Sequence, residues 1–202
     1  PHQLEWTGQI RQAGWHLLHM INDTLDLARI ESGHIDLEPR TLDLAELVAA
    51  AQALVQQAAD KRGIRIEAHL ALGAHAVIGD ATRVKQILTN LLSNAVKYNS
   101  DGGNVIVARR MADEGRIALD VIDTGAGMNP QQLAQLFQPF NRLGQEGGAV
   151  DGTGIGLVIS LRLAELMGGT LHVRSSLGMG STFTLELPRA AVAPAPYLGD
   201  DG

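Results

Sequence analysis

The sequence predicts an α+β fold, a two-layer sandwich with helices on one face of a mixed, mostly antiparallel sheet, preceded by a segment of a helical bundle. Three observations support this expectation. Apolar residues recur at helical spacing over residues 4–30, and strand-like patterns become frequent after residue 104. In addition, 15 of the 23 glycines fall between Gly102 and Gly180, which indicates backbone that turns tightly or approaches a ligand closely.

The first predicted element is a helix over residues 4–30. Its heptad seam consists of Trp6, Ile10, Ala13, Leu17, Met20, Thr24 and Leu27. The seam is widened by Leu18, Ile21, Leu25 and Ala28 to the breadth of a four-helix bundle. A helix that packs on its own domain is the alternative that the pattern leaves open. Residues 37–41 then form a predicted extended connector.

Helices and strands alternate through the middle of the chain. Asp43, with Glu46 three residues later, resembles a capping box and predicts the start of a second helix. Residues 64–66 alternate like a strand. Asp80 is expected to cap a third helix that ends near Tyr98.

Most elements predicted after residue 104 are strands. Strand patterns occur over residues 105–107, 117–122, 170–174 and 182–187. A short helix is predicted after Pro130 and a longer one near Gly154. We therefore expect residues 1–38 to belong to a helical bundle, residues 39–188 to form the sandwich and residues 189–202 to be a disordered tail.

Composition excludes several classes of protein. The formal net charge of −6 argues against nucleic-acid binding. The absence of cysteine excludes a disulfide scaffold and a thiol nucleophile, and suits a reducing, cytoplasmic location. Neither an apolar run of about 18 residues nor a signal-peptide pattern occurs, so we expect no membrane contact by this segment. A membrane anchor elsewhere in a longer parent protein stays open.

Two clusters contain side chains suited to bind a nucleotide. Asn90, Asn94 and Lys97 share one face of the third helix, where amide oxygens suit Mg²⁺ and an ammonium suits phosphate. Asp123 follows an apolar strand and precedes Gly125, and its carboxylate can accept hydrogen bonds from the edge of a planar base. Taken alone, these patterns are equally typical of a solvated helix face and of an ordinary Asp-Gly turn.

Two further clusters suggest a phosphate loop and its cover. Gly152, Gly154 and Gly156 open a helix, whose N-terminus favours an anion. Leu157 stands where a dinucleotide-binding fingerprint needs its third glycine, and the chain has no P-loop motif. Phe137, Phe140 and Arg142 precede a glycine-rich stretch that could form a lid, although both rings could equally belong to the core.

Together and in this order, the clusters resemble the motifs of a sensor histidine kinase of two-component signalling. The N box corresponds to residues 90–98, the G1 box to 123–127, the F box to 137–140 and the G2 box to 152–156. Residues 178–185 resemble the closing strand of the same domain. The resemblance implies the Bergerat ATP-binding fold shared with Hsp90, MutL and gyrase B, and a protein-histidine kinase activity that uses ATP and Mg²⁺.

The resemblance also implies roles for individual residues. Asn94 would coordinate Mg²⁺, Lys97 would contact phosphate and Tyr98 would stack near adenine. Asp123 would accept the adenine amino group, with Thr182 near the same pocket. The implied nucleotide-binding set is Asn90, Asn94, Lys97, Tyr98, Asp123, Gly125, Gly127, Met128, Phe140, Gly152, Thr153, Gly154, Ile155, Gly156, Leu157 and Thr182.

Asn90, Lys97 and Arg142 are the implied catalytic residues, with Asn90 supporting metal and phosphates and Arg142 assisting at the γ-phosphate. The hydrolases of this superfamily place a glutamate four residues before the metal-binding asparagine. Here that position is Asn90, which cannot act as a general base. Phosphoryl transfer is therefore favoured over ATP hydrolysis.

The first helix resembles the second helix of a dimerisation and histidine-phosphotransfer domain. None of the seven histidines is followed by the phosphoacceptor pattern, so we expect the acceptor on a helix of the parent kinase or of another chain. The expected partners are that helix, a response regulator receiver domain and a second copy of the chain. One alternative is a non-catalytic nucleotide-binding or dimerising module. Another is a serine kinase of the anti-sigma type, although a kinase of that type is not expected to contain the bundle-like first helix.

Overall fold

The computed structural model describes residues 2–70, 76–113, 115–141 and 153–191. Its elements are α1 (His2–Glu31), β1 (Arg40–Asp43), α2 (Leu44–Lys61), β2 (Arg65–His69), β3 (Ala76–Gly79), α3 (Ala81–Lys97), β4 (Asn104–Asp113), β5 (Arg116–Asp123), α4 (Pro130–Gln135), α5 (Gly156–Leu166), β6 (Thr170–Ser175) and β7 (Ser181–Pro188). Among these described residues, no helix is both long and apolar enough to cross a membrane.

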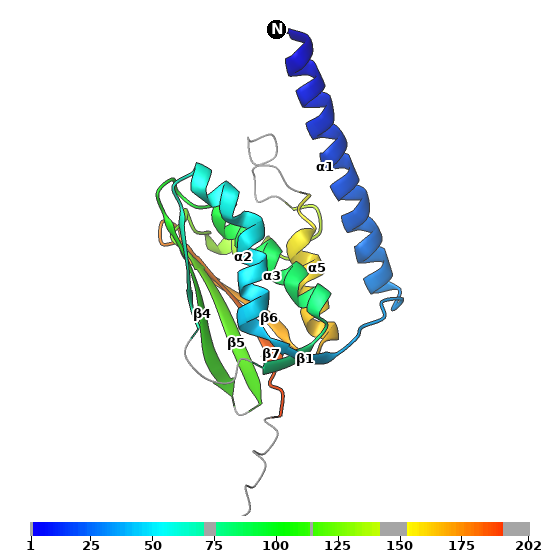
Figure 1. The fold of residues 1–202 in the computed structure, drawn as a ribbon, viewed down its shortest axis with the longest axis vertical. Coiled ribbons are helices and arrows are strands. Elements are labelled where there is room, and N and C mark those ends of the chain that lie inside the picture. The colour runs from blue at the N-terminus through cyan, green and yellow to red at the C-terminus, as the bar shows by residue number, and fades with distance from the viewer. Residues whose placement is uncertain (1, 71–75, 114, 142–152, 192–202) are drawn as a thin grey trace, which may run out of the picture.

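The molecule is a two-layer sandwich with one long helix beside it. The main sheet has the order β2-β4-β5-β7-β6, in which β2 and β4 are parallel and the other neighbours antiparallel. Helices α2, α3 and α5 cover one face of this sheet, and α1 runs beside α5 (Figure 1). The fold class predicted from the sequence is confirmed.

The core lies between the sheet and its three covering helices. Ile117, Leu119 and Val121, alternate residues of β5, belong to this core, and Ala118 between them is also buried because β5 is the central strand of the sheet. Leu88 and Leu92, four residues apart on α3, are buried on the facing side of the helix. Helix α3 is the middle helix of the layer and packs against both α2 and α5.

Both predicted helix caps are present. The side chain of Asp43 accepts a hydrogen bond from Ala45 N at 2.7 Å at the start of α2. Asp80 Oδ1 accepts from Thr82 N and Arg83 N at the start of α3, and its Oδ2 accepts from Glu38 N at 3.0 Å. Burial raises the pKa of Asp80, but these amides and the charge of Arg83 outweigh it, so the pKa lies below its ordinary value. Asp80 thus joins the connector to the start of α3.

A second, two-stranded sheet corrects the prediction for the connector. Arg40–Asp43 pairs antiparallel with Ala76–Gly79, and neither strand was expected. The predicted tail also begins too early, because Arg189 forms a bridge with Val77 and Ala190 N donates to Ala76 O at 3.0 Å. Residues 192–202 of that tail lie outside the described residues.

Helix α1 packs against its own domain near its C-terminal end. Leu27 and Ile30, near its C-terminal end, are buried against the sandwich. Leu17, Ile21 and Leu25 remain about half exposed, at 57%, 48% and 51%. One end of the helix therefore packs on its own domain, whereas Trp6, Leu17, Leu18, Ile21 and Leu25, whose side chains the structure describes, stay exposed.

Candidate functional site

Helix α3 presents three of the predicted site residues from one face. Asn90, Asn94 and Lys97 are half-buried, and the Nζ of Lys97 lies 5.0 Å from the centre of the Tyr98 ring, within cation–π distance. Asn90 Nδ2 donates to Ser160 Oγ of α5 at 2.9 Å. Asn90 therefore joins α3 to α5, and Lys97 and Tyr98 lie where α3 ends.

Asp123 is a buried carboxylate at the end of β5. Its side chain is almost completely enclosed, with the residue 6% exposed. Oδ1 accepts hydrogen bonds from Gly125 N at 2.8 Å and from Ser181 N at 3.2 Å. Among the described residues no hydrogen bond engages Oδ2, so this oxygen can still accept from a ligand.

The environment of Asp123 affects its protonation. Burial raises the pKa of its carboxyl group above the ordinary value of 3.8, and the hydrogen bonds from Gly125 and Ser181 lower it by less. A buried carboxylate with a raised pKa at the end of a strand is a frequent property of functional sites.

The glycines of the G1 box make room for neighbouring backbone. A Cβ at Gly125 would overlap the carbonyl oxygen of Tyr98, and a Cβ at Gly127 would overlap that of Ser176. Gly127 also has a φ of +65°, which favours glycine. The contacts observed at these two glycines are with the end of α3 and with the β6–β7 hairpin. Met128 follows them, packed against the core, and its N donates to Ser175 Oγ at 2.9 Å.

The start of α5 contacts α3 and α1. A Cβ at Gly156 would lie 2.6 Å from Asn90 Oδ1, so the two helices approach closely there. Thr153 Oγ1 donates to Asp23 Oδ2 of α1 at 2.7 Å and accepts from Ile155 N at 3.3 Å. The side chain of Ile155 is completely buried in the core, and Leu157 packs partly against the same core.

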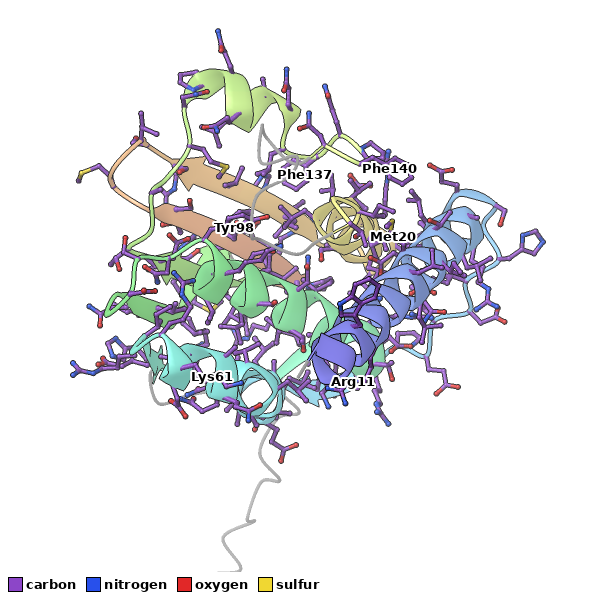
Figure 2. The ribbon with its side chains drawn as sticks, turned by 90° about the horizontal axis from the view of Figure 1, so that it is seen from above. Arg11, Met20, Lys61, Tyr98, Phe137 and Phe140 are labelled. Atoms are coloured by element: carbon purple, nitrogen blue, oxygen red, sulfur yellow. The ribbon has the colours of Figure 1, made fainter. Side chains whose placement is uncertain are left out.

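The two phenylalanines of the F box differ in environment. Phe137 packs against the core, whereas Phe140 is 59% exposed and has a φ of +64°, which is unusual for a residue other than glycine. The backbone of Phe140 lies close to Gly154, and Figure 2 shows both rings near the start of α5, with Tyr98 at the end of α3. Arg142, Gly152 and the expected lid between them lie outside the described residues.

The structure places Thr182 differently from the expectation. In the register of β5 and β7, Thr182 pairs with Ile122 and Ser181 pairs with Asp123. Because paired residues point to the same face and neighbours point to opposite faces, Ser181 shares a face with Asp123 and Thr182 does not. Ser181, which the sequence analysis did not name, therefore lies beside Asp123, and the strand alternation around Phe183 is the signal that assigns it to this face.

The residues present fit Mg²⁺ bound together with a nucleotide. Asn94 is half-buried on α3, and no hydrogen bond among the described residues engages its amide oxygen, a hard donor that suits this ion. The same part of the chain contains no cluster of three or more His, Cys, Asp or Glu side chains that could hold a metal. Mg²⁺ in nucleotide sites commonly combines few protein ligands with phosphate oxygens and water.

Comparison with known proteins agrees with this geometry. The family described as "Histidine kinase-, DNA gyrase B-, and HSP90-like ATPase" matches residues 79–191. The chain is 36% identical over 197 residues to the histidine protein kinase DivJ of Caulobacter vibrioides, covering 95% of this chain and 33% of DivJ. It therefore spans about a third of the length of that relative.

Solved structures show the same arrangement. Full-length ShkA in complex with AMPPNP has a TM-score of 0.82 and 32% identity, covering 96% of this chain and 41% of ShkA. The histidine kinase ThkA in complex with the response regulator protein TrrA has a TM-score of 0.70 over 90% of this chain and 49% of ThkA, and at 21% identity it shows the fold alone. Through the match over residues 79–191, the chain belongs to the histidine kinase-, DNA gyrase B- and HSP90-like ATPase family, and it carries the ATP-binding catalytic domain found in sensor histidine kinases.

Proposed function

We propose that this chain binds ATP with Mg²⁺ beside α3 and transfers the γ-phosphoryl group to a histidine outside the chain. The observation that carries the proposal is the buried Asp123, whose Oδ1 is held by two backbone amides while Oδ2 is left to accept from an adenine amino group. The polar face of α3, with Asn94 and Lys97, ends at Tyr98, whose carbonyl group lies against the backbone of Gly125. A single nucleotide can therefore span both groups.

The residues of α3 have complementary tasks in this proposal. Lys97 neutralises phosphate charge, and Asn94 holds Mg²⁺, which supplies further charge neutralisation when bound. Phosphoryl transfer needs positioning and electrostatic stabilisation more than covalent chemistry from the protein. Asn94 and Lys97 supply these without a nucleophile of their own.

The position of Asn90 supports transfer rather than hydrolysis. Its amide is bonded to Ser160 and packed against Gly156, and an amide cannot take a proton from water as a carboxylate can. The site therefore offers no general base at this position, so the γ-phosphoryl group persists until an acceptor histidine is presented.

The uncovered stripe of α1 supports the proposed partners. Trp6, Leu17, Leu18, Ile21 and Leu25 are all exposed, and one helix cannot bury such a stripe by itself. We propose that the stripe packs in a four-helix bundle with the phosphoacceptor helix and a second copy of the chain. A response regulator receiver domain would take the phosphoryl group from that histidine, on the cytoplasmic side, where ATP is found.

Phosphorylation in trans tests this function. The chain is mixed with radiolabelled ATP, Mg²⁺ and a helical hairpin that carries the phosphoacceptor histidine of a sensor kinase, and acid-labile, alkali-stable label on the hairpin is measured. We expect label with the unchanged chain, loss of it in Asn94→Ala, and no loss in Asn104→Ala, which removes an exposed asparagine at the start of β4.

Two outcomes would contradict the proposal. Absence of labelled histidine despite ATP binding by calorimetry would favour a non-catalytic nucleotide-binding module. Equal labelling in Asn94→Ala and the unchanged chain would remove Asn94 from the metal site.

A further inference from the structure

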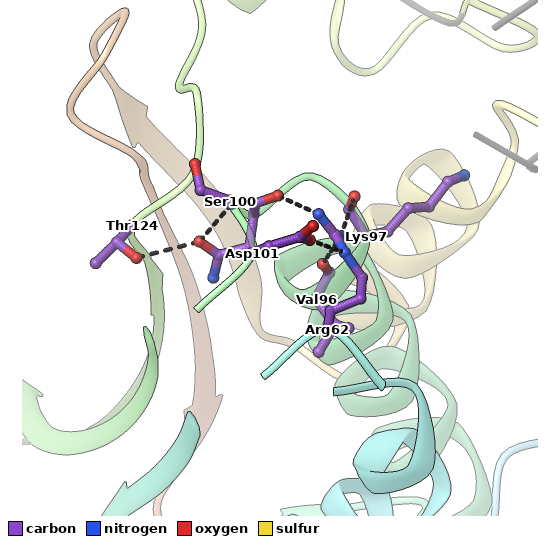
Figure 3. Close-up of polar contacts among 7 residues, drawn as sticks. Arg62, Val96, Lys97, Ser100, Asp101 and Thr124 are labelled. Carbon is purple, nitrogen blue, oxygen red and sulfur yellow. Dashed lines mark hydrogen bonds and ion pairs between the residues drawn. The ribbon is translucent and has the colours of Figure 1, made fainter. Parts of the chain in front are cut away.

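Arg62 forms an unusually dense set of contacts outside every sequence motif. It caps the C-terminal end of α2. Its Nη1 donates to Val96 O at 2.6 Å and to Lys97 O at 2.9 Å, and its Nη2 donates to Asn99 O at 2.7 Å. Its Nε also donates to Asp101 Oδ1 at 2.8 Å (Figure 3). All four partners of this side chain lie at or just beyond the end of α3.

The three carbonyl groups are the type of acceptor that a helix end leaves unpaired. The last carbonyls of an α-helix have no partner within the helix and lie at the negative end of its dipole. A planar guanidinium presents several N–H donors in a fixed arrangement, so one side chain can hold three of these oxygens at once. An ammonium group has no such fixed fork, and a neutral side chain lacks the charge.

The contact continues from the end of α3 to the loop that contains Asp123. Asn99, whose carbonyl Arg62 holds, is 6% exposed. Its Oδ1 accepts from Thr124 Oγ1 at 3.1 Å, and its Nδ2 donates to Asn104 O at 3.0 Å. Thr124 Oγ1 also accepts from Asn104 N at 2.9 Å. Thr124 directly follows Asp123, so a chain of hydrogen bonds leads from Arg62 to the adenine-recognising loop.

We propose that Arg62 is a positioning residue for the nucleotide, holding the Lys97 end of α3 at the distance from Asp123 that an adenine nucleotide requires. The inference rests on the proposed function, because it takes Lys97 as the phosphate contact and Asp123 as the adenine contact. Arg62 touches neither ligand group itself. It fixes the backbone on both sides of Tyr98, whose carbonyl in turn faces Gly125 of the adenine loop.

A positioning residue and an ordinary helix cap are distinguished by the ligands whose affinity they change. A ligand that reaches both ends, such as ATP or ADP, depends on the spacing between Lys97 and Asp123. Adenosine reaches only Asp123. A cap that merely stabilises the fold would change the affinity for all three ligands equally, through the folded fraction alone.

Calorimetric binding of ATP and adenosine to the full chain tests the proposal, with Arg62→Ala, Arg62→Lys and the control Arg65→Ala. Arg65 is an exposed arginine three residues away on β2. We expect Arg62→Ala to weaken ATP binding about tenfold, which corresponds to the free energy of about one to two hydrogen bonds. Adenosine binding should change by less than about twofold. Arg62→Lys should lie between Arg62→Ala and the unchanged chain, and Arg65→Ala should behave as the unchanged chain.

A double-mutant cycle with Lys97→Ala gives an independent measurement. If Arg62 acts through the position of Lys97, Arg62→Ala should weaken ATP binding by less than about twofold once Lys97 is absent. Equal losses for ATP and adenosine, unchanged ATP affinity in a folded Arg62 variant, or additive effects in the cycle would overturn the proposal. If Arg62→Ala does not fold, the ratio of ATP to adenosine affinity in Arg62→Lys decides the question.

The outcomes also separate the inference from the function on which it rests. If the unchanged chain fails to bind ATP, or Lys97→Ala binds it normally, the proposed nucleotide site is wrong and the role of Arg62 is overturned with it. If both behave as proposed and the Arg62 variants bind ATP normally, the inference alone is wrong.

Discussion

At the scale of single residues, Asp123 shows how the local environment decides what a side chain can do. Its carboxylate is enclosed at the end of β5, and burial raises its pKa above the ordinary value. Because the folded-state pKa lies above the unfolded one, the protonated form is favoured by folding. The stabilising contribution is complete below the unfolded pKa and is lost as the pH rises through the folded pKa.

The substitution Asp123→Asn should separate stability from binding. If Oδ1 stays bonded to Gly125 N and Ser181 N, the new amide nitrogen replaces Oδ2 and presents a donor to the adenine amino group. We expect ATP binding to fall at least about tenfold, while the melting temperature at pH 7 is unchanged or higher because the buried charge is removed. Calorimetry and thermal unfolding measure the two effects.

The control is Asp36→Asn, an exposed aspartate outside the site, which should alter neither quantity. The unchanged chain should also lose ATP affinity as the pH falls through the raised pKa of Asp123, whereas Asp123→Asn should not titrate in that window. A lower melting temperature in Asp123→Asn at pH 7, or normal ATP affinity, would contradict this account of the residue.

At the scale of elements, the close approach of α3 and α5 connects the N box to the G2 box. Asn90 Nδ2 donates to Ser160 Oγ, and Asn90 Oδ1 faces Gly156. The small residue at the start of α5 is therefore favoured by its packing against the Asn90 side chain as well as by its position in a glycine-rich motif. Tight helix contacts of this kind tolerate an added methyl group poorly.

Gly156→Ala should lower the free energy of unfolding by about 1–3 kcal/mol, because the new Cβ would displace Asn90 from Ser160. Chemical denaturation monitored by circular dichroism measures the change. In an Asn90→Ala background the same substitution should cost little, since the displaced amide is absent.

Gly14→Ala is the matched control for this substitution. A Cβ at Gly14 meets nothing within 4 Å, and the residue lies exposed in α1. Alanine there should leave stability unchanged or raise it by about 0.5–1 kcal/mol. An equal cost of Gly156→Ala with and without Asn90 would show that the packing contact is not the cause.

At the scale of the whole molecule, α1 forms side-chain hydrogen bonds with the G2 box and with α3. Asp23 accepts from Thr153 in the G2 box, and Asp26 accepts from Gln86 of α3 at 3.2 Å. Leu27 and Ile30 are buried beside these polar contacts. Helix α1 is therefore joined to the loop that the family resemblance associates with phosphate.

Asp23→Ala should loosen this loop without unfolding the domain. Thr153 loses its acceptor, so the bond from Ile155 N to Thr153 Oγ1 is expected to open more often. Hydrogen–deuterium exchange should rise for a peptide that covers residues 153–157. Asp26→Ala, which removes the contact to α3 instead, should leave that peptide unchanged, and an equal rise in both variants would refute the local coupling.

Much of the fold and part of the site followed from local patterns. Asp43 and Asp80 were identified as caps because an N-cap is determined by a few neighbouring residues. The polar face of α3 followed from helical spacing. Strand alternation assigns Ser181 to the face of Phe183, but the contact of Ser181 with Asp123 depends on the pairing of β5 with β7, and the burial of Ile155 depends on helices and strands distant in the chain.

The sequence by itself determined the main helices, most strands of the large sheet, the motifs of an ATP-binding domain and the apolar stripe of the first helix. These depend on spacing and side-chain chemistry within short windows. Only the tertiary structure decided that Arg40–Asp43 pairs with Ala76–Gly79, that the stripe of α1 is divided between the sandwich and solvent, and that Arg62 joins α2 to the end of α3. The physical reason is that each of these depends on a partner far away in sequence, and only folding brings the partners together.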